Sequence, residues 1–123
     1  LERARATDHS LAQQRQAMIA MRERGIAFIF TRESQAEPRL FPALKDIFGG
    51  PLIANQQLDV ATAESVIREG KADAAAWGKL FIANPDLVRR FAEGLPLNEP
   101  DNSTFYAGGS EGYTDYPFAD ATR

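Results

Sequence analysis

Two predicted loops hold residues that could bind a ligand, and each follows an apolar run and leads into a stretch with helical spacing. One contains Asn55, Gln56 and Gln57, and the other begins with Gly78 and Lys79. Glycine lets the backbone approach a ligand closely, and lysine supplies a positive charge. Backbone N–H groups at the start of a helix favour an anion such as phosphate. Taken without further context, however, a turn glycine beside a solvated lysine is the more common arrangement.

The residue counts disfavour several other kinds of chemistry. With no cysteine, the chain forms no disulfide, thiolate metal site or cysteine nucleophile. The single histidine, His9, lies in a polar stretch, so we expect neither a metal site nor a Ser-His-Asp triad. A formal charge of −3 argues against nucleic acid or an anionic membrane as a partner. No apolar run approaches the roughly 20 residues that span a bilayer, and a cytoplasmic location is expected.

Helices and strands are predicted to alternate along the chain, which would place both loops at the carboxyl ends of strands. Strands are predicted at 26–30, buried on both faces, at 51–54 and at 72–77, where the alanines suit a helix equally well. Helices are predicted from a Thr7, Asp8 or Ser10 cap to about Arg24, over 40–48, from Asp59 to Gly70, and from Asn84 through Pro85 to Gly94.

This order, without a hairpin signal, predicts parallel strands joined by right-handed crossovers. Three such strands leave edges that need covering, and they suit a section of a larger α/β barrel of about 250 residues. We therefore expect residues 1–94 to form part of a (β/α) barrel.

The remaining residues, 95–123, differ in character from the rest. They are rich in Pro, Gly, Asn and Asp and show no helical period. Disordered tails are poor in aromatic residues, and this segment is not. We therefore expect it to pack on the barrel through an aromatic set: Phe105, Tyr106, Tyr113, Tyr116 and Phe118.

Six blocks of the sequence, in order, resemble the Old Yellow Enzyme family of FMN-dependent ene-reductases. The last long block, Glu111-Gly112-Tyr113-Thr114-Asp115-Tyr116-Pro117, is highly specific, as is Ile82-Ala83-Asn84-Pro85-Asp86-Leu87. The similarity is greatest to the bacterial branch with N-ethylmaleimide, morphinone and pentaerythritol tetranitrate reductases. The blocks span 24–28, 50–56, 78–87, 96–98, 104–106 and 111–117.

The resemblance implies a fold and an activity. The family forms a (β/α)8 TIM barrel that binds FMN non-covalently, takes hydride from NAD(P)H and reduces activated alkenes such as enones and maleimides. The three strands here would be the sixth to eighth of the barrel. Asn55, Gln56 and Gln57, together with Gly78 and Lys79, would hold the FMN phosphate. Tyr106, with Phe105 before it, would line the substrate pocket.

Two positions depart from the family pattern. Many relatives have Arg where this chain has Lys79, and lysine keeps the charge but loses the two-pronged fork of a guanidinium. Many relatives also have Gly where this chain has Gln57. If the loop requires a positive φ angle there, glutamine is a strained choice.

For several other residues we expect structural roles. Arg89 and Arg90 are expected on a solvated helix face, and Trp77 in packing. Tyr113 and Tyr116 are expected to anchor the C-terminal segment.

The family's hydride-transfer residues have no counterpart among these blocks, so we expect no catalytic residue in the chain. It would then supply part of a reductase that needs the N-terminal barrel portion for activity. Alternatively, it is a non-enzymatic phosphate-binding or self-associating fragment. An unrelated α/β phosphate-binding domain would require the C-terminal motif to be a coincidence.

Overall fold

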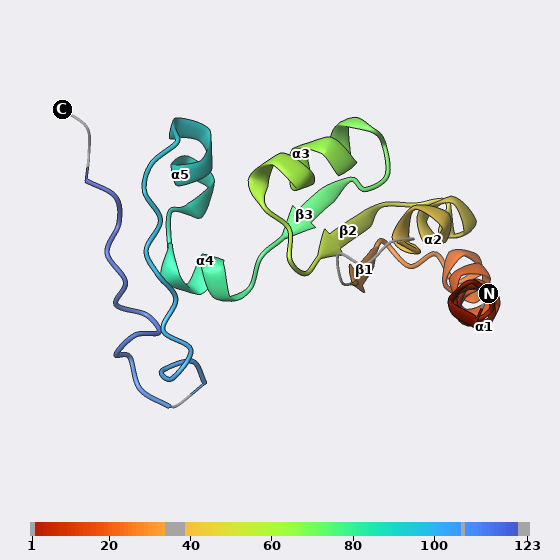
Figure 1. The fold of residues 1–123 in the computed structure, drawn as a ribbon, viewed down its shortest axis with the longest axis horizontal. Coiled ribbons are helices and arrows are strands. Elements are labelled where there is room, and N and C mark those ends of the chain that lie inside the picture. The colour runs from red at the N-terminus through yellow and green to blue at the C-terminus, as the bar shows by residue number, and fades with distance from the viewer. Residues whose placement is uncertain (1, 34–38, 107, 121–123) are drawn as a thin grey trace. The chain divides into compact units, whose positions relative to one another are not determined.

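A computed structural model describes residues 2–33, 39–106 and 108–120, with side chains described from residue 12 onward (Figure 1). The chain divides into two compact units, Leu1–Ala76 and Trp77–Arg123. The first contains three helices and a small sheet, and the second contains two short helices and a long irregular segment. Each unit is described by itself below. The predicted role of His9 lies outside the described side chains.

The first helix, α1, runs over Glu2–Glu23 and begins well before its predicted caps. Thr7, Asp8 and Ser10 lie inside it, so the prediction that one of them caps the helix was wrong. The residues before them include Ala, Arg and Glu, which are strong helix formers and extend the helix toward the N-terminus. Its end was predicted correctly, because Gly25 follows it in a left-handed conformation with φ of 66°.

Three parallel strands form the sheet of the first unit, in the order β1-β2-β3 (Figure 1). They are β1 (Ile29–Arg32), β2 (Leu52–Asn55) and β3 (Ala74–Ala76). Ile29 is in register with Leu52, and Ile53 with Ala74. The predicted parallel sheet is confirmed, and the alanines of the third strand are extended.

The first strand differs from its prediction in position and in burial. It begins at Ile29 and not at Ile26, because Ile29 is the first residue in register with β2. Ile29 is buried, whereas Phe28 and Phe30 are 51% and 54% exposed, so the strand is not buried on both faces. Among the described residues β1 pairs with β2 alone, which leaves its other edge open.

Helices α2 (Phe41–Phe48) and α3 (Val60–Arg68) were predicted within two residues of their bounds. The N-terminus of α2 is capped at a distance by Glu33, whose carboxylate accepts hydrogen bonds from the N–H groups of Leu40 and Phe41 at 2.6 and 3.0 Å. The predicted Asp59 cap of α3 is confirmed, since its Oδ1 accepts from the Thr62 N–H at 2.7 Å.

The second unit contains α4 (Lys79–Ala83) and α5 (Leu87–Glu93). Helix α4 was missed, because a loop was expected between the third strand and the helix at Asn84. The predicted cap at Asn84 was wrong: this residue ends α4, and its side-chain amide donates to the Leu80 carbonyl at 2.9 Å. Gly94 ends α5 with φ of 64°, as predicted. Trp77 packs edge-on against Phe91, with ring centroids 5.1 Å apart, also as predicted.

Arg90 was predicted on a solvated helix face, and this prediction was wrong. Its side chain is only 4% exposed and donates to Asp86 Oδ1 at 2.6 Å. It is therefore not part of a solvated face, unlike its neighbour Arg89, which is 36% exposed and pairs with Glu93. The described part of 95–120 forms no regular helix or strand and contacts α5 through hydrogen bonds such as that from Arg90 Nη2 to the Pro117 carbonyl. The predicted domain boundary at residue 94 stays a prediction.

No helix within the described residues has the length and apolar character needed to cross a membrane. The same residues contain no cluster of His, Cys, Asp and Glu able to hold a metal ion.

Candidate functional site

The first predicted group of site residues follows β2 directly. Asn55 is the last residue of the strand, and its side-chain amide donates to the Ala76 carbonyl at 2.8 Å. Ala76 is the last residue of β3 and the register partner of Asn55. The Asn55 side chain therefore ties the carboxyl ends of β2 and β3 together, and its backbone carbonyl accepts from the Glu33 N–H at 3.4 Å.

Gln56 and Gln57 both lie in the left-handed region of backbone space, with φ angles of 83° and 55°. Residues with side chains rarely adopt this region, and each such residue costs about 1–2 kcal/mol. The strain expected for Gln57 is therefore confirmed, and it extends to Gln56. Successive N–H groups in a turn of this kind form a concavity that suits an anion.

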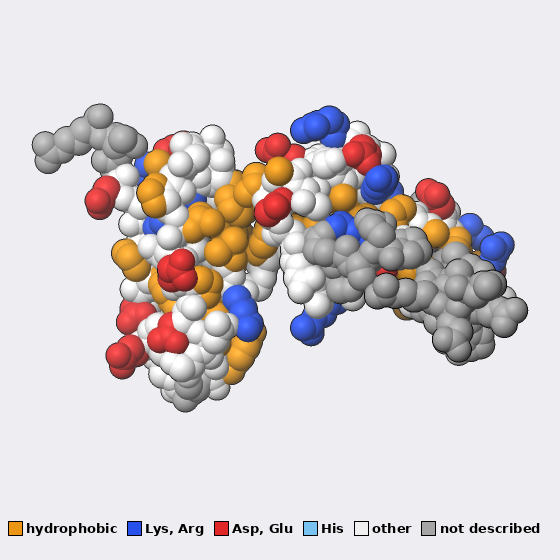
Figure 2. All heavy atoms as spheres, in the orientation of Figure 1, with side chains coloured by type: hydrophobic (Ala, Val, Ile, Leu, Met, Phe, Trp, Pro, Cys, Tyr) orange, Lys and Arg blue, Asp and Glu red, His pale blue; other side chains and the backbone are white. Residues whose placement is uncertain are grey.

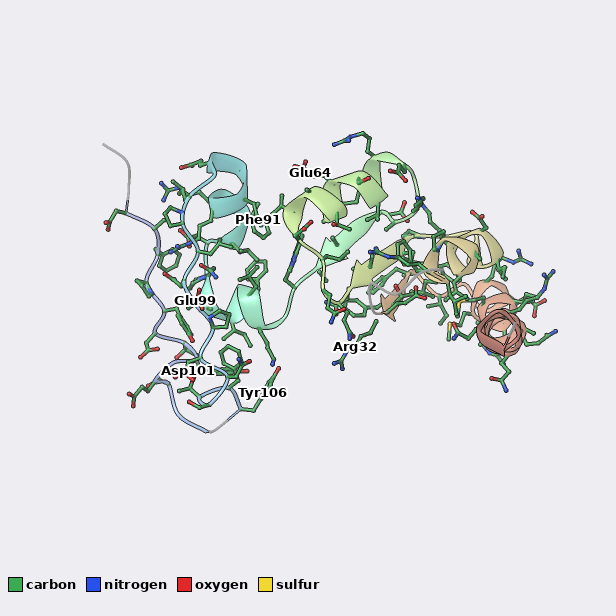
Figure 3. All side chains as sticks on the ribbon, in the orientation of Figure 1. Arg32, Glu64, Phe91, Glu99, Asp101 and Tyr106 are labelled. Atoms are coloured by element: carbon green, nitrogen blue, oxygen red, sulfur yellow. The ribbon has the colours of Figure 1, made fainter. Side chains whose placement is uncertain are left out.

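Arg32 joins this group, although the sequence analysis did not single it out. Its Nε donates to the Gln56 side-chain oxygen at 2.7 Å. Arg32 is the last residue of β1 and the register partner of Asn55, so strand pairing brings its side chain to the same edge of the sheet. Figure 3 shows its exposed side chain projecting from this end of the strand. The available signal was its place two residues after the strand predicted at 26–30.

The second group, Gly78 and Lys79, belongs to the second unit. A Cβ atom on Gly78 would meet no atom within 4 Å, so packing within the unit does not require a glycine there. Lys79 begins α4 and is exposed. Arg89 and Arg90 are both in ion pairs, which makes Lys79 the one cation of the described second unit outside such a pair. Its ammonium group is thus available to an anion.

Charge is unevenly divided between the two units. Residues 77–123 contain 4 Lys or Arg and 7 Asp or Glu, a net charge of −3, while residues 1–76 contain 10 of each. Figure 2 shows acidic side chains, in red, on the surface of the second unit. An anion would therefore be repelled by the general charge of this unit, and its binding there would depend on the local charge of Lys79.

The third group, Phe105 and Tyr106, consists of neighbours with opposite environments. Phe105 is 8% exposed and contacts the Tyr113 ring edge-on, with centroids 6.4 Å apart. Tyr106 is 79% exposed, has φ of 62°, and lies 5.9 Å from the same Tyr113 ring. Figure 3 shows Tyr106 projecting from the loop. Phe105 anchors the loop inside the unit, and Tyr106 presents an aromatic ring outward.

The predicted site residues thus form three local groups. Asn55, Gln56 and Gln57 lie together with Arg32 in the first unit, while Gly78 lies beside Lys79, and Phe105 beside Tyr106, in the second. Backbone strain links two of these groups. Within the described residues, the non-glycine positions with positive φ are Gln56, Gln57 and Tyr106, and all three are predicted site residues.

Comparison of the sequence with protein-family models finds no match. Individual relatives are nevertheless close. A protein from Oryza sativa subsp. japonica named 12-oxophytodienoate reductase 1 is 50% identical over 72 residues, or 58% of this chain and 19% of the relative. A Leishmania infantum protein described as a probable flavin mononucleotide-dependent alkene reductase is 42% identical over 74 residues, 60% of this chain and 20% of its own length.

Two solved structures match the fold of this chain. Morphinone reductase in complex with tetrahydroNAD matches with a TM-score of 0.80 and 40% identity, over 89% of this chain and 31% of that one. The Old Yellow Enzyme homologue from Zymomonas mobilis matches with a TM-score of 0.79 and 37% identity, over 84% of this chain and 31% of that one. The three parallel strands therefore correspond to part of a TIM barrel. The chain spans about a fifth of the length of these curated relatives, and it matches part of the TIM barrel of Old Yellow Enzyme homologues.

Proposed function

We propose that this chain supplies the FMN phosphate-binding loops, and one wall of the substrate pocket, of an NAD(P)H-dependent reductase of activated alkenes. The observation that carries the proposal is that the residues with strained backbone angles are also residues predicted to bind the cofactor or the substrate. The family resemblance implies a cofactor or substrate contact for Gln56, Gln57 and Tyr106, and these three residues hold the positive φ angles of the described non-glycine residues. Strain of this kind is concentrated at functional sites in proteins.

The residues present suit the phosphate end of FMN. The turn at Gln56 and Gln57 offers backbone N–H groups, Arg32 adds a guanidinium at the same sheet edge, and Gly78 and Lys79 add an open backbone and a cation. Phosphate recognition by backbone amides and one or two cations is common in α/β proteins. When bound, FMN would supply the hydride chemistry, and this chain would contribute by holding and orienting the cofactor.

Tyr106 suits a different task, which is contact with the substrate. Its exposed ring and left-handed backbone place an aromatic face outward from a loop anchored by Phe105. Such a ring would contact an alkene substrate and exclude water from it. No proton donor is assigned within this chain, and activity is proposed only for an assembly that includes the remaining barrel.

The open side of the first unit suits that remaining barrel portion. A groove of about 490 Å³ lies between α1 and β1, and its apolar walls include Met18, Met21, Ile26 and Phe28. The free edge of β1 offers backbone groups for pairing with another parallel strand. We propose that the N-terminal portion of a barrel covers both the groove and the edge.

Co-expression tests this proposal. The chain would be produced together with the rest of a barrel from the Leishmania infantum relative, and the complex would be purified and assayed for enone reduction with NADPH and NADH. We expect a complex that retains FMN and reduces the enone, while either part alone is inactive. The assignment of the loops would be contradicted by a well-folded complex whose affinity for FMN does not change when Lys79 and Gln57 are replaced.

The alternative is a fragment that associates with itself and has no catalytic role. It is favoured by the same exposed rings, Phe28 and Phe30, because large apolar patches drive association. Replacing both with serine should then lower the association constant in sedimentation velocity. Val88→Ser is the matched control, because Val88 is 70% exposed on α5. Unchanged association in the double variant would count against this alternative.

A further inference from the structure

We infer that Arg90 is a positioning residue that fixes the base of the loop carrying Phe105 and Tyr106. The loop, described over residues 101–106 and 108–116, is called the tyrosine loop here, because it contains all three tyrosines of the chain. Its two legs are residues 96–100, which lead into it, and 117–119, which leave it. A single guanidinium group on α5 holds both legs.

The contacts of Arg90 carry this inference. Its Nη1 donates to the Pro96 carbonyl on the first leg, and its Nη2 donates to the Pro117 carbonyl on the second leg at 2.8 Å. Its Nε donates to Asp86 Oδ1 at 2.6 Å. The three nitrogens thus bond to three separate partners. Residues 21 positions apart in the sequence are brought together by one side chain.

Two further side chains complete this stem clamp, which we define as Asp86, Arg90 and Asn98. The second oxygen of Asp86 accepts from the Ala119 N–H at 2.9 Å, so the partner of Arg90 also holds the second leg. Asn98 Nδ2 lies 2.8 Å from both the Ala83 carbonyl and the Pro117 carbonyl, which connects the first leg to α4 and to the second leg. Each leg is therefore held at more than one point.

The tyrosine loop itself is closed by its own contacts. The Asp101 N–H donates to the Tyr116 hydroxyl at 2.8 Å, and Thr104 Oγ1 donates to the Gly112 carbonyl at 2.6 Å. Phe105 packs within the loop against Tyr113. Because the loop is a closed body, its position on the unit is set at its legs, which is where the clamp acts.

Burial explains why arginine occupies this position. The side chains of Arg90 and Asp86 are 4% and 8% exposed, so water competes little for their hydrogen bonds. Lysine at this position would keep the charge opposite Asp86, but one ammonium group cannot hold two separate carbonyls and a carboxylate in the fixed geometry of a guanidinium. Arg90→Lys is therefore a variant that separates charge from positioning.

The role of Arg90 toward a substrate rests on the proposed function, because it acts through Tyr106. Its role in placing the tyrosine loop does not, and the two are tested separately. All tyrosines lie in the loop, and the single tryptophan, Trp77, packs on α5 through Phe91. Fluorine NMR of the full chain labelled with fluorotyrosine and fluorotryptophan thus gives loop and helix reporters in one sample.

In Arg90→Met and Arg90→Lys we expect the tyrosine resonances to lose their dispersion while the Trp77 resonance keeps its position. Arg89→Met is the matched control, since Arg89 pairs with Glu93 and bonds only to the far end of the second leg, at the Ala119 carbonyl, and to Asp120 after it, and it should leave both reporters in place. Unchanged tyrosine resonances in the Arg90 variants would overturn the inference. So would a joint displacement of tyrosine and tryptophan signals in both variants, which would show that Arg90 merely stabilises the unit.

The assembled reductase provides the functional readout. With Arg90→Lys we expect KM for the enone to rise about tenfold, with unchanged FMN affinity, because the ring of Tyr106 is displaced. A fall in FMN affinity without a change in KM would contradict the positioning role. An assembly without FMN would count against the proposed function, and the NMR result would still decide the clamp.

Discussion

Gln56 and Gln57 adopt positive φ angles one after the other, at the point where β2 ends. Neither residue is a glycine, which is the one residue that adopts this conformation without strain. The side chain of Gln56 is held by Arg32, which compensates part of the cost with a hydrogen bond of 2.7 Å. The strain is local, and it marks the turn that we assign to the FMN phosphate.

Replacing Gln57 with glycine should stabilise the chain. Removal of the left-handed strain gains about 1–2 kcal/mol, and the added freedom of the unfolded glycine chain costs about 0.5–1 kcal/mol. A net gain of about 0–1.5 kcal/mol is therefore expected in urea unfolding. Gln57→Ala loses the same side-chain contacts but keeps Cβ, so it should show no gain. Equal stabilities of the two variants would show that the turn is not strained.

Acid should destabilise the first unit through Asp73. Its carboxylate accepts from the Leu52 N–H at 2.8 Å and pairs with Lys45 at 3.0 Å, and these contacts hold its pKa below the ordinary value of 3.8. A lowered pKa in the folded state stabilises the protein above pH 3.8, and this contribution is lost as pH falls through the folded pKa. The carboxyl groups of Asp59, Glu69, Asp86 and Asp101 have lowered pKa values as well.

The urea midpoint should therefore fall as pH drops from 5 toward 2. Asp73→Asn should lower the midpoint at pH 7 and make this pH dependence shallower. Asp46→Asn, on the exposed side of α2, is the control and should follow the parent chain. A steeper acid transition in Asp73→Asn than in the parent would reverse the sign that we derive.

Gly112 should tolerate no side chain. Its φ is 62°, and a Cβ atom there would lie 2.4 Å from Thr104 Oγ1, inside any normal contact distance. The left-handed backbone alone costs about 1–2 kcal/mol in Gly112→Ala, and displacement of Thr104 adds to it. Gly109→Ala is the control, because no atom lies within 4 Å of its Cβ position. Unfolding followed by Trp77 fluorescence should separate the two variants, and equal stabilities would contradict the described loop.

Much of the first unit could be predicted because its signals are local. Asp59 is followed three residues later by the N–H that it caps, and the glycines at 25, 49 and 94 end helices with left-handed φ angles. The parallel sheet followed from the alternation of strands and helices. The strained turn at Gln57 was anticipated from a departure in the family pattern.

What could not be predicted depends on contacts distant in the sequence. Glu33 caps α2 from seven residues away, and Arg32 reaches Gln56 only because β1 and β2 pair in register. Arg90 was placed on a solvated face because adjacent arginines in a polar helix usually face water. Its burial follows from the return of residue 117 to α5, which no helical period encodes. The position of Asn84 depends in the same way on Asn98.

The central claim is that this chain provides the phosphate-binding loops for FMN. It is tested most directly in the purified one-to-one complex with the remaining barrel, by titrating FMN and riboflavin, which differ only in the phosphate. We expect FMN to bind at least about 100-fold more tightly, as charge-assisted hydrogen bonds to a phosphate require. Lys79→Met should narrow that ratio about tenfold, whereas Lys71→Met, whose parent side chain pairs with Glu69, should not. Equal affinity for the two flavins in a folded complex would contradict the claim.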